Sequence, residues 1–209
     1  EPGAPWDRLK KFRGIARLRM AAESPDATQQ QWDDARTDLE AAIAADPTDI
    51  ESAVTLSQYW DILADRAEKA NQRDLATKNF QAGTEILANF LKANPTNPLA
   101  ILSLVRRDMV MSIREFQIAQ EAARNSGKAA DLNELAVKAS KDFTERAKPK
   151  LDEAVTAASA LPPAKIDSQV VGLLRQMEQA VDGAARLSRT QALLASVPDK
   201  DATPDHFMM

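Results

Sequence analysis

Apolar side chains recur every three or four residues along most of this chain, and short proline- or asparagine-containing breaks interrupt the pattern. Ala53, Leu56, Trp60, Leu63 and Ala67 show this spacing clearly. Residues at these steps share one side of an α-helix, and such an apolar side must be buried against another element. The sequence therefore predicts an all-α fold of packed helices without β-strands.

The breaks divide the chain into seven or eight helices joined by short connections. We expect helices over residues 6–23, 28–45, 48–70, 75–94, 98–125, 130–147 and 165–196. Pro149 either kinks the sixth helix or starts a further one. Three starts carry capping signals, namely Thr28 with Gln31, Thr48 with Glu51, and Asn97 before Pro98. Short connections favour antiparallel neighbours, so the helices should form hairpins.

Two segments repeat one spacing of small, apolar and proline residues. The first is Ala35-x-x-x-Leu39-x-x-Ala42-Ile43-x-x-x-Pro47. The second is Gly83-x-x-x-Leu87-x-x-Phe90-Leu91-x-x-x-Pro95, so the two prolines lie 48 residues apart. A fixed period of this kind is the sequence signature of a repeat architecture, in which neighbouring units stack to bury a shared core.

The first segment resembles the second helix and inter-repeat turn of a tetratricopeptide repeat (TPR). Leu56, Ser57 and Trp60 are similar to the large–small–aromatic triplet in the first helix of the next TPR. The resemblance covers residues 6–125, although the period exceeds the family's usual length of about 34 residues. It implies antiparallel hairpins stacked as a right-handed superhelix. Hairpin stacking without TPR geometry is the alternative.

This interpretation divides the chain into four parts. Residues 1–5 form a disordered lead-in, residues 6–125 the TPR-like hairpins, residues 126–197 additional helices that cap the array, and residues 198–209 a flexible tail. The long helix expected over 165–196 is the C-terminal cap of the array, because it would cover the last apolar face.

Composition excludes several classes of partner and site. The formal net charge is −4, and basic residues cluster only briefly at 8–13 and 106–107, so we expect no nucleic-acid binding. No apolar run approaches the roughly 20 residues of a membrane-spanning helix, so we expect no membrane insertion. The chain has no cysteine, which excludes disulfides, cysteine-based zinc sites and thiol catalysis. This absence slightly favours an extracytoplasmic location but is compatible with the cytoplasm.

We find no residue pattern for catalysis, metal binding or a cofactor. The single histidine, His206, lies in the tail without triad or ligand partners, and the six glycines form no phosphate-binding loop. Five aromatic residues are predicted to form helix-interface core rather than a ligand pocket: Trp32, Tyr59, Trp60, Phe80 and Phe90. Among these, Tyr59 is the one that could face a groove, because its neighbour Trp60 must point elsewhere.

The predicted function is a non-catalytic scaffold that binds a partner protein or peptide through a helical groove. Because the first helices of TPRs line the concave face, the resemblance implies contacts from Val54, Gln58, Asp61, Leu102, Arg106 and Met109. Arg106 is the first candidate, since a guanidinium binds a carboxylate with two hydrogen bonds. Leu102 and Met109 fit a core position equally well. A structural module that self-assembles into a homo-oligomer is the alternative, and a small-molecule sensor or enzyme is less favoured.

Overall fold

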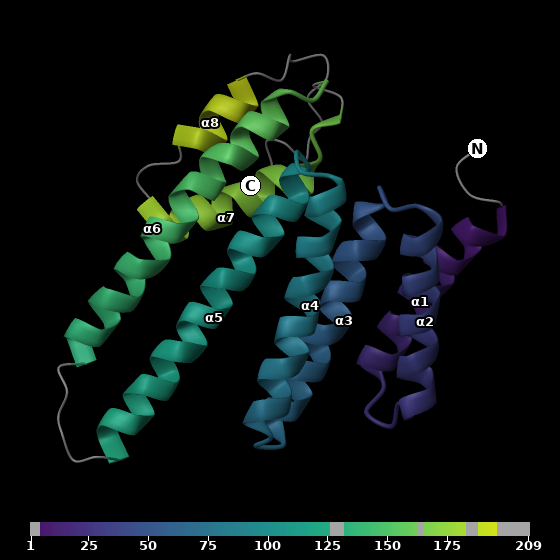
Figure 1. Ribbon diagram of the computed structural model, residues 1–209, viewed down its shortest axis with the longest axis horizontal. Coiled ribbons are helices and arrows are strands. Elements are labelled where there is room, and N and C mark those ends of the chain that lie inside the picture. The colour runs from purple at the N-terminus through teal and green to yellow at the C-terminus, as the bar shows by residue number, and fades with distance from the viewer. Residues whose placement is uncertain (1–4, 126–131, 163–164, 183–187, 196–209) are drawn as a thin grey trace. The chain divides into compact units, whose positions relative to one another are not determined.

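The computed structural model describes residues 5–125, 132–162, 165–182 and 188–195, which form eight α-helices and no strand (Figure 1). The predicted all-α fold is confirmed. The contacts divide the chain into two compact units, Glu1–Pro95 and Thr96–Met209. Helices α5 (Pro98–Asn125) and α6 (Leu132–Ser159) pack on each other and both belong to the second unit. The division after residue 125 into TPR-like hairpins and capping helices stays a prediction.

The first unit consists of two stacked helical hairpins. These are α1 (Pro5–Glu23) with α2 (Gln29–Ala45), and α3 (Ile50–Lys69) with α4 (Arg73–Ala93). Helix α3 packs on α1 and α2 as well as on α4, which joins the two hairpins. Residues of the predicted apolar stripes, Leu18, Trp32, Leu39 and Leu56, meet in one core. On α3 this core also contains Tyr59, while Trp60 and Leu63 of the predicted stripe are only partly buried against it.

Two of the expected capping signals are present, and one is shifted by a residue. Thr28 and Gln31 form the predicted capping box at the start of α2. The backbone N–H of Ala100 donates to the Asn97 side chain at the start of α5 (3.0 Å). The box predicted at Thr48 is wrong. Asp49 caps α3 instead, because its carboxylate accepts from both the backbone N–H and the hydroxyl of Ser52.

The turn between α3 and α4 is a Schellman motif. The N–H of Gln72 donates to the carbonyl of Ala67 (2.8 Å), and the N–H of Asn71 donates to that of Glu68 (2.9 Å). Asn71 takes a positive φ of 58°, which asparagine tolerates better than most residues. This motif ends α3 sharply, so that α4 begins at Arg73 and returns along it.

The 48-residue repeat has a structural counterpart. The paired positions Ala35 and Gly83, and Leu39 and Leu87, are all buried. The side-chain amide of Asn94 donates to the carbonyl of Pro47 (2.8 Å), which ties the end of α4 to the turn after α2. The repeated spacing thus corresponds to two equivalent second helices of stacked hairpins, while TPR geometry itself stays a prediction.

The second unit contains α5, α6, α7 (Ser168–Asp182) and α8 (Ser188–Ala195). Helix α6 continues through Pro149 instead of ending there. The single capping helix expected over 165–196 is wrong. Backbone N–H groups of Arg189 and Thr190 donate to the side chain of Glu178. In a continuous helix these residues would lie about 16 Å or more apart, so α7 and α8 are separate helices.

Candidate functional site

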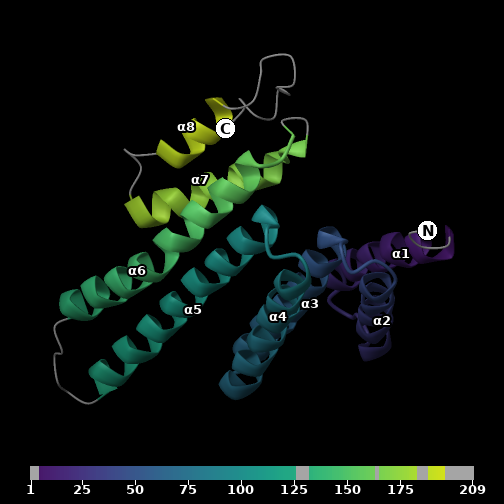
Figure 2. The same ribbon diagram turned by 45° about the horizontal axis from the view of Figure 1, so that its top comes forward.

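The longest helices of the chain form a hairpin that its own unit covers only in part. Helices α5 and α6 have 28 residues each, whereas α7 has 15 and α8 has 8. Figures 1 and 2 show α7 and α8 gathered at one end of this hairpin. Among the described helices of this unit, α5 packs mainly on α6 and α7, and α6 packs on α5, α7 and α8.

An apolar cavity of about 240 Å³ opens along one side of this hairpin. We name it the α5–α6 groove and define it by its lining residues: Met109, Ser112, Ile113, Phe116, Ala136, Ala139, Ser140, Phe143 and Ala180. None of these residues is charged. Phe143 is buried in it, whereas 49% of Ile113 is exposed to solvent. A large apolar side chain is therefore left half uncovered next to an apolar cavity.

Four charged residues of the hairpin line a second cleft. This smaller cavity, of about 170 Å³, is lined by Glu115, Lys138, Asp142 and Arg146 together with apolar residues. The Arg146 guanidinium donates to both carboxylate oxygens of Asp108 (3.1 and 3.2 Å), which connects α6 to α5. The two clefts thus differ in chemistry, and only the α5–α6 groove offers an uncharged surface.

Of the six residues predicted to bind a partner, three lie on α5 and differ in their surroundings. Met109 lines the α5–α6 groove. Arg106 is exposed, and it lies one helical turn before Met109 and two before Ile113, on the same side of α5. Leu102 is fully buried, so it belongs to the core and offers no contact surface.

The other three predicted residues lie on α3, in the first unit. Gln58 is exposed, while Val54 and Asp61 are half buried. Their spacing places them on one side of α3. The structure therefore distributes the six residues over two units, and only Met109 among them lines a described cavity.

Four of the five aromatic residues predicted to form core are buried, and Trp60 is partly buried against them. The rings of Trp32 and Tyr59 lie 6.0 Å apart, and those of Tyr59 and Trp60 lie 5.1 Å apart edge to face. Tyr59 is buried rather than facing a groove, and burial raises the pKa of its phenol above the ordinary value. The Arg66 guanidinium stacks 4.3 Å from the centre of the Trp32 ring, a cation–π contact.

The first unit has a cleft of its own between α2 and α4, with a volume of about 330 Å³. Ile43 and Ile86 form its walls and are half buried, and Leu56 and Phe90 are buried within it. Glu40, at its edge, is already paired with Arg36. This cleft lacks a strongly exposed large apolar side chain, so the α5–α6 groove is the better candidate for binding.

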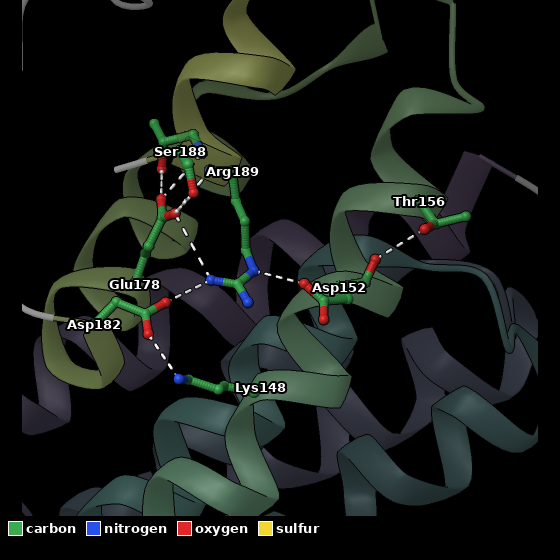
Figure 3. A network of polar contacts seen from close by, with 8 residues as sticks. Lys148, Asp152, Thr156, Glu178, Asp182, Ser188 and Arg189 are labelled. Carbon is green, nitrogen blue, oxygen red and sulfur yellow. Dashed lines mark hydrogen bonds and ion pairs between the residues drawn. The ribbon is translucent and has the colours of Figure 1, made fainter. Parts of the chain in front are cut away.

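A buried carboxylate holds α8 on α7 (Figure 3). Glu178 is fully buried, and its Oε1 accepts from the N–H of Arg189 (2.7 Å). Its Oε2 accepts from the N–H and the hydroxyl of Thr190 (3.0 and 2.8 Å). The first N–H groups of a helix lack partners within the helix and carry partial positive charge. Glu178 therefore acts as an N-terminal cap for α8.

Ion pairs extend this cap to α6. Arg189 donates to Asp152 and to Asp182 (2.6 Å each), and Lys148 lies 3.0 Å from Asp182 (Figure 3). The hydrogen bond from Lys148, together with that from Arg189, lowers the pKa of Asp182 below the ordinary carboxyl value. Each carboxylate of this network accepts from donors of a neighbouring helix. The network therefore has a structural role and stabilises the packing of α6, α7 and α8.

Asp38 has a similar role in the first unit. Its buried carboxylate accepts from Nε of Arg13 and from Nη1 of Arg17 (2.7 Å each), which links α2 to α1. The hydrogen bonds from Arg13 lower the pKa of Asp38 below the ordinary value. Among the described residues, no three histidine or acidic side chains come together as metal ligands. His206 lies outside the described residues.

The apolar spacing of the sequence identified the large residues of the groove, but it did not predict that part of their surface is exposed. Ile113, Phe116 and Phe143 belong to the apolar stripes, which predict core positions.

No described helix is both long and apolar enough to cross a membrane. Comparisons with protein-family models, with curated proteins and with solved structures give no match for this chain.

Proposed function

We propose that this chain is a non-catalytic protein-interaction module that binds a partner protein in the α5–α6 groove. One observation supports this proposal above all. Ile113 is 49% exposed beside an uncharged cavity whose base is formed by Phe143. Fully burying an isoleucine contributes about 1.5–3 kcal/mol, so leaving half of it in water forgoes roughly 1 kcal/mol. A partner that covers the groove would recover this free energy.

The geometry of the hairpin supports a protein partner. Helices bury apolar stripes most readily against other helices, and a groove between two helices accepts the apolar side of a third. Helix α7 reaches the groove only through Ala180. A segment of another protein can therefore extend the packing that α7 begins.

A matched pair of variants tests this proposal. Ile113 and Ile118 lie on the same helix and are exposed to a similar extent (49% and 54%), but only Ile113 lines the groove. Wild type, Ile113→Glu and Ile118→Glu are immobilised and exposed to a lysate of the source organism. Circular dichroism checks that both variants keep their helix content.

We expect wild type and Ile118→Glu to capture a set of proteins from the lysate that Ile113→Glu does not capture. Introducing a charge into an apolar groove costs several-fold in affinity or more, because the carboxylate loses water without gaining a partner. Identical sets of retained proteins for all three chains would refute the groove as the binding surface.

Self-assembly is the second candidate, and α1 supplies the observation that favours it. Leu9, Phe12 and Met20 share one side of α1 and are 54%, 62% and 67% exposed. Ala16 lies between them and would permit a second helix to approach closely. Light scattering over a range of concentrations tests this candidate. If the chain self-assembles through α1, wild type forms a dimer and Phe12→Glu is a monomer. A wild-type monomer at all concentrations would contradict self-assembly.

A further inference from the structure

We infer that the ligand of the α5–α6 groove is an amphipathic helix of a partner protein, with acidic side chains beside its apolar stripe. Arg106 would bind one of these carboxylates at the edge of the groove. This inference rests on the proposed function and adds the chemical class of the ligand to it.

The length of the groove fits two turns of a helix. Its lining runs from Met109 to Phe116 on α5 and from Ala136 to Phe143 on α6, so that seven residue steps separate the two ends on each helix. At a rise of 1.5 Å per residue, both walls are about 10 Å long. Apolar side chains at positions i, i+3 or i+4, and i+7 of a bound helix span the same distance.

The charges around the groove favour an acidic ligand. The lining of the groove is uncharged, while the acidic Glu115 and Asp142 line only the second cleft, which shares Ser112, Phe116 and Ala139 with the groove. Arg106 lies on the groove side of α5, is exposed, and has no ion-pair partner among the described residues. An unpaired guanidinium at the rim attracts carboxylates and can bind one with two hydrogen bonds.

Two lysines of α6 have ion-pair partners, since Lys141 pairs with Glu145 one turn along the helix and Lys148 pairs with Asp182. Lys138 lines the second cleft instead of the groove. A preference of the groove for acidic ligands would therefore depend on Arg106. Its position one turn before Met109 places the contact at the Met109 end of the groove.

Two synthetic helical peptides of 18 residues test the inference. Both carry leucines at i, i+3, i+7 and i+10, and the flanking positions are glutamate in one peptide and lysine in the other. Fluorescence anisotropy measures the binding of each peptide to the full chain and to its variants. The variants are Ile113→Glu, Arg106→Glu and Arg124→Glu. Arg124 is the control, because it is exposed on the same side of α5 but about 27 Å further along the helix.

We expect the acidic peptide to bind wild type and Arg124→Glu about threefold or more tightly than it binds Arg106→Glu, the upper range of an exposed ion pair. The lysine peptide should bind wild type more weakly than the acidic peptide. The difference between the two peptides should shrink at high salt, where exposed charges are screened. Ile113→Glu should abolish the binding of both.

The two ways of failing are distinguishable. If Ile113→Glu abolishes binding but Arg106→Glu binds both peptides as wild type does, the groove binds helices and the acidic preference is wrong. If neither peptide binds, or if Ile113→Glu binds as wild type does, the proposed function fails as well. Sedimentation of the chain without peptide shows whether a second copy of the chain occupies the groove. A dimer that only Ile113→Glu dissociates would show that a second copy occupies the groove, and would overturn the inference.

Discussion

Replacing Glu178 by glutamine should release α8 from α7. The carboxylate is fully buried and accepts hydrogen bonds from two backbone N–H groups and a hydroxyl at the start of α8. Glutamine keeps the shape and one acceptor oxygen. Its amide NH₂, however, would face donors of either Arg189 or Thr190, so that at least one side of the cap is lost.

The size of the effect follows from these contacts. A hydrogen bond to a charged group contributes about 1.5–3 kcal/mol, and a carboxylate at a helix N-terminus adds about 0.3–1 kcal/mol. The cost of burying the charge offsets part of this gain. We therefore expect Glu178→Gln to lower the free energy of local unfolding of α8 by about 2–4 kcal/mol, and Glu178→Ala by more.

Hydrogen exchange measures this effect at the residues concerned. Backbone amides of Ser188–Ala195 should lose protection in Glu178→Gln, while those of α5 keep theirs. Asp152→Asn is the control, because Asp152 is largely exposed and its pair with Arg189 should contribute no more than about 1 kcal/mol. The reasoning is refuted if Glu178→Gln and Asp152→Asn change the protection of α8 equally.

Two further predictions concern the first unit. The folded-state pKa of Asp38 lies below its ordinary value of 3.8, so its pairing stabilises the fold above about pH 5 and is lost as the pH falls below 3.8. Urea unfolding at pH 7 and pH 3 should thus show a smaller pH dependence for Asp38→Asn than for wild type, and an equal dependence would contradict this role. A Cβ at Gly14 would lie 2.9 Å from Cγ of Leu39. Gly14→Val should consequently lower the free energy of unfolding by about 1–3 kcal/mol at neutral pH, and an unchanged urea midpoint would show that α1 and α2 can move apart freely.

Local sequence signals predicted most helices because each helix depends on its own spacing and caps. The stripe through Leu56 and Ala67 and the box at Thr28 act within a few residues, and the structure reproduces both. The sequence did not predict the separation of α7 from α8, because this separation depends on contacts between residues that are not neighbours in the sequence. Ala184 and Leu187 continue the apolar spacing of the preceding helix. The hydrogen bonds that show the separation come from Glu178, more than one turn away along the chain.

The candidate site could be predicted only in part. Spacing identifies the apolar side of α5, and so it includes Met109, Ile113 and Phe116. It does not reveal whether a neighbouring helix covers that side, because coverage depends on the length and position of α7. Leu102 and Ile113 share the same stripe, yet the first is fully buried and the second is half exposed.

The central claim is that the α5–α6 groove binds a helix of another protein. Methyl NMR of the full chain during titration with the acidic peptide tests it most directly, since Ile113 and Ile118 report on opposite sides of α5. The account predicts that signals of Met109 and Ile113 shift in a saturable manner while that of Ile118 stays in place. Shifts at Ile118 alone, or no shift at saturating peptide, would contradict it.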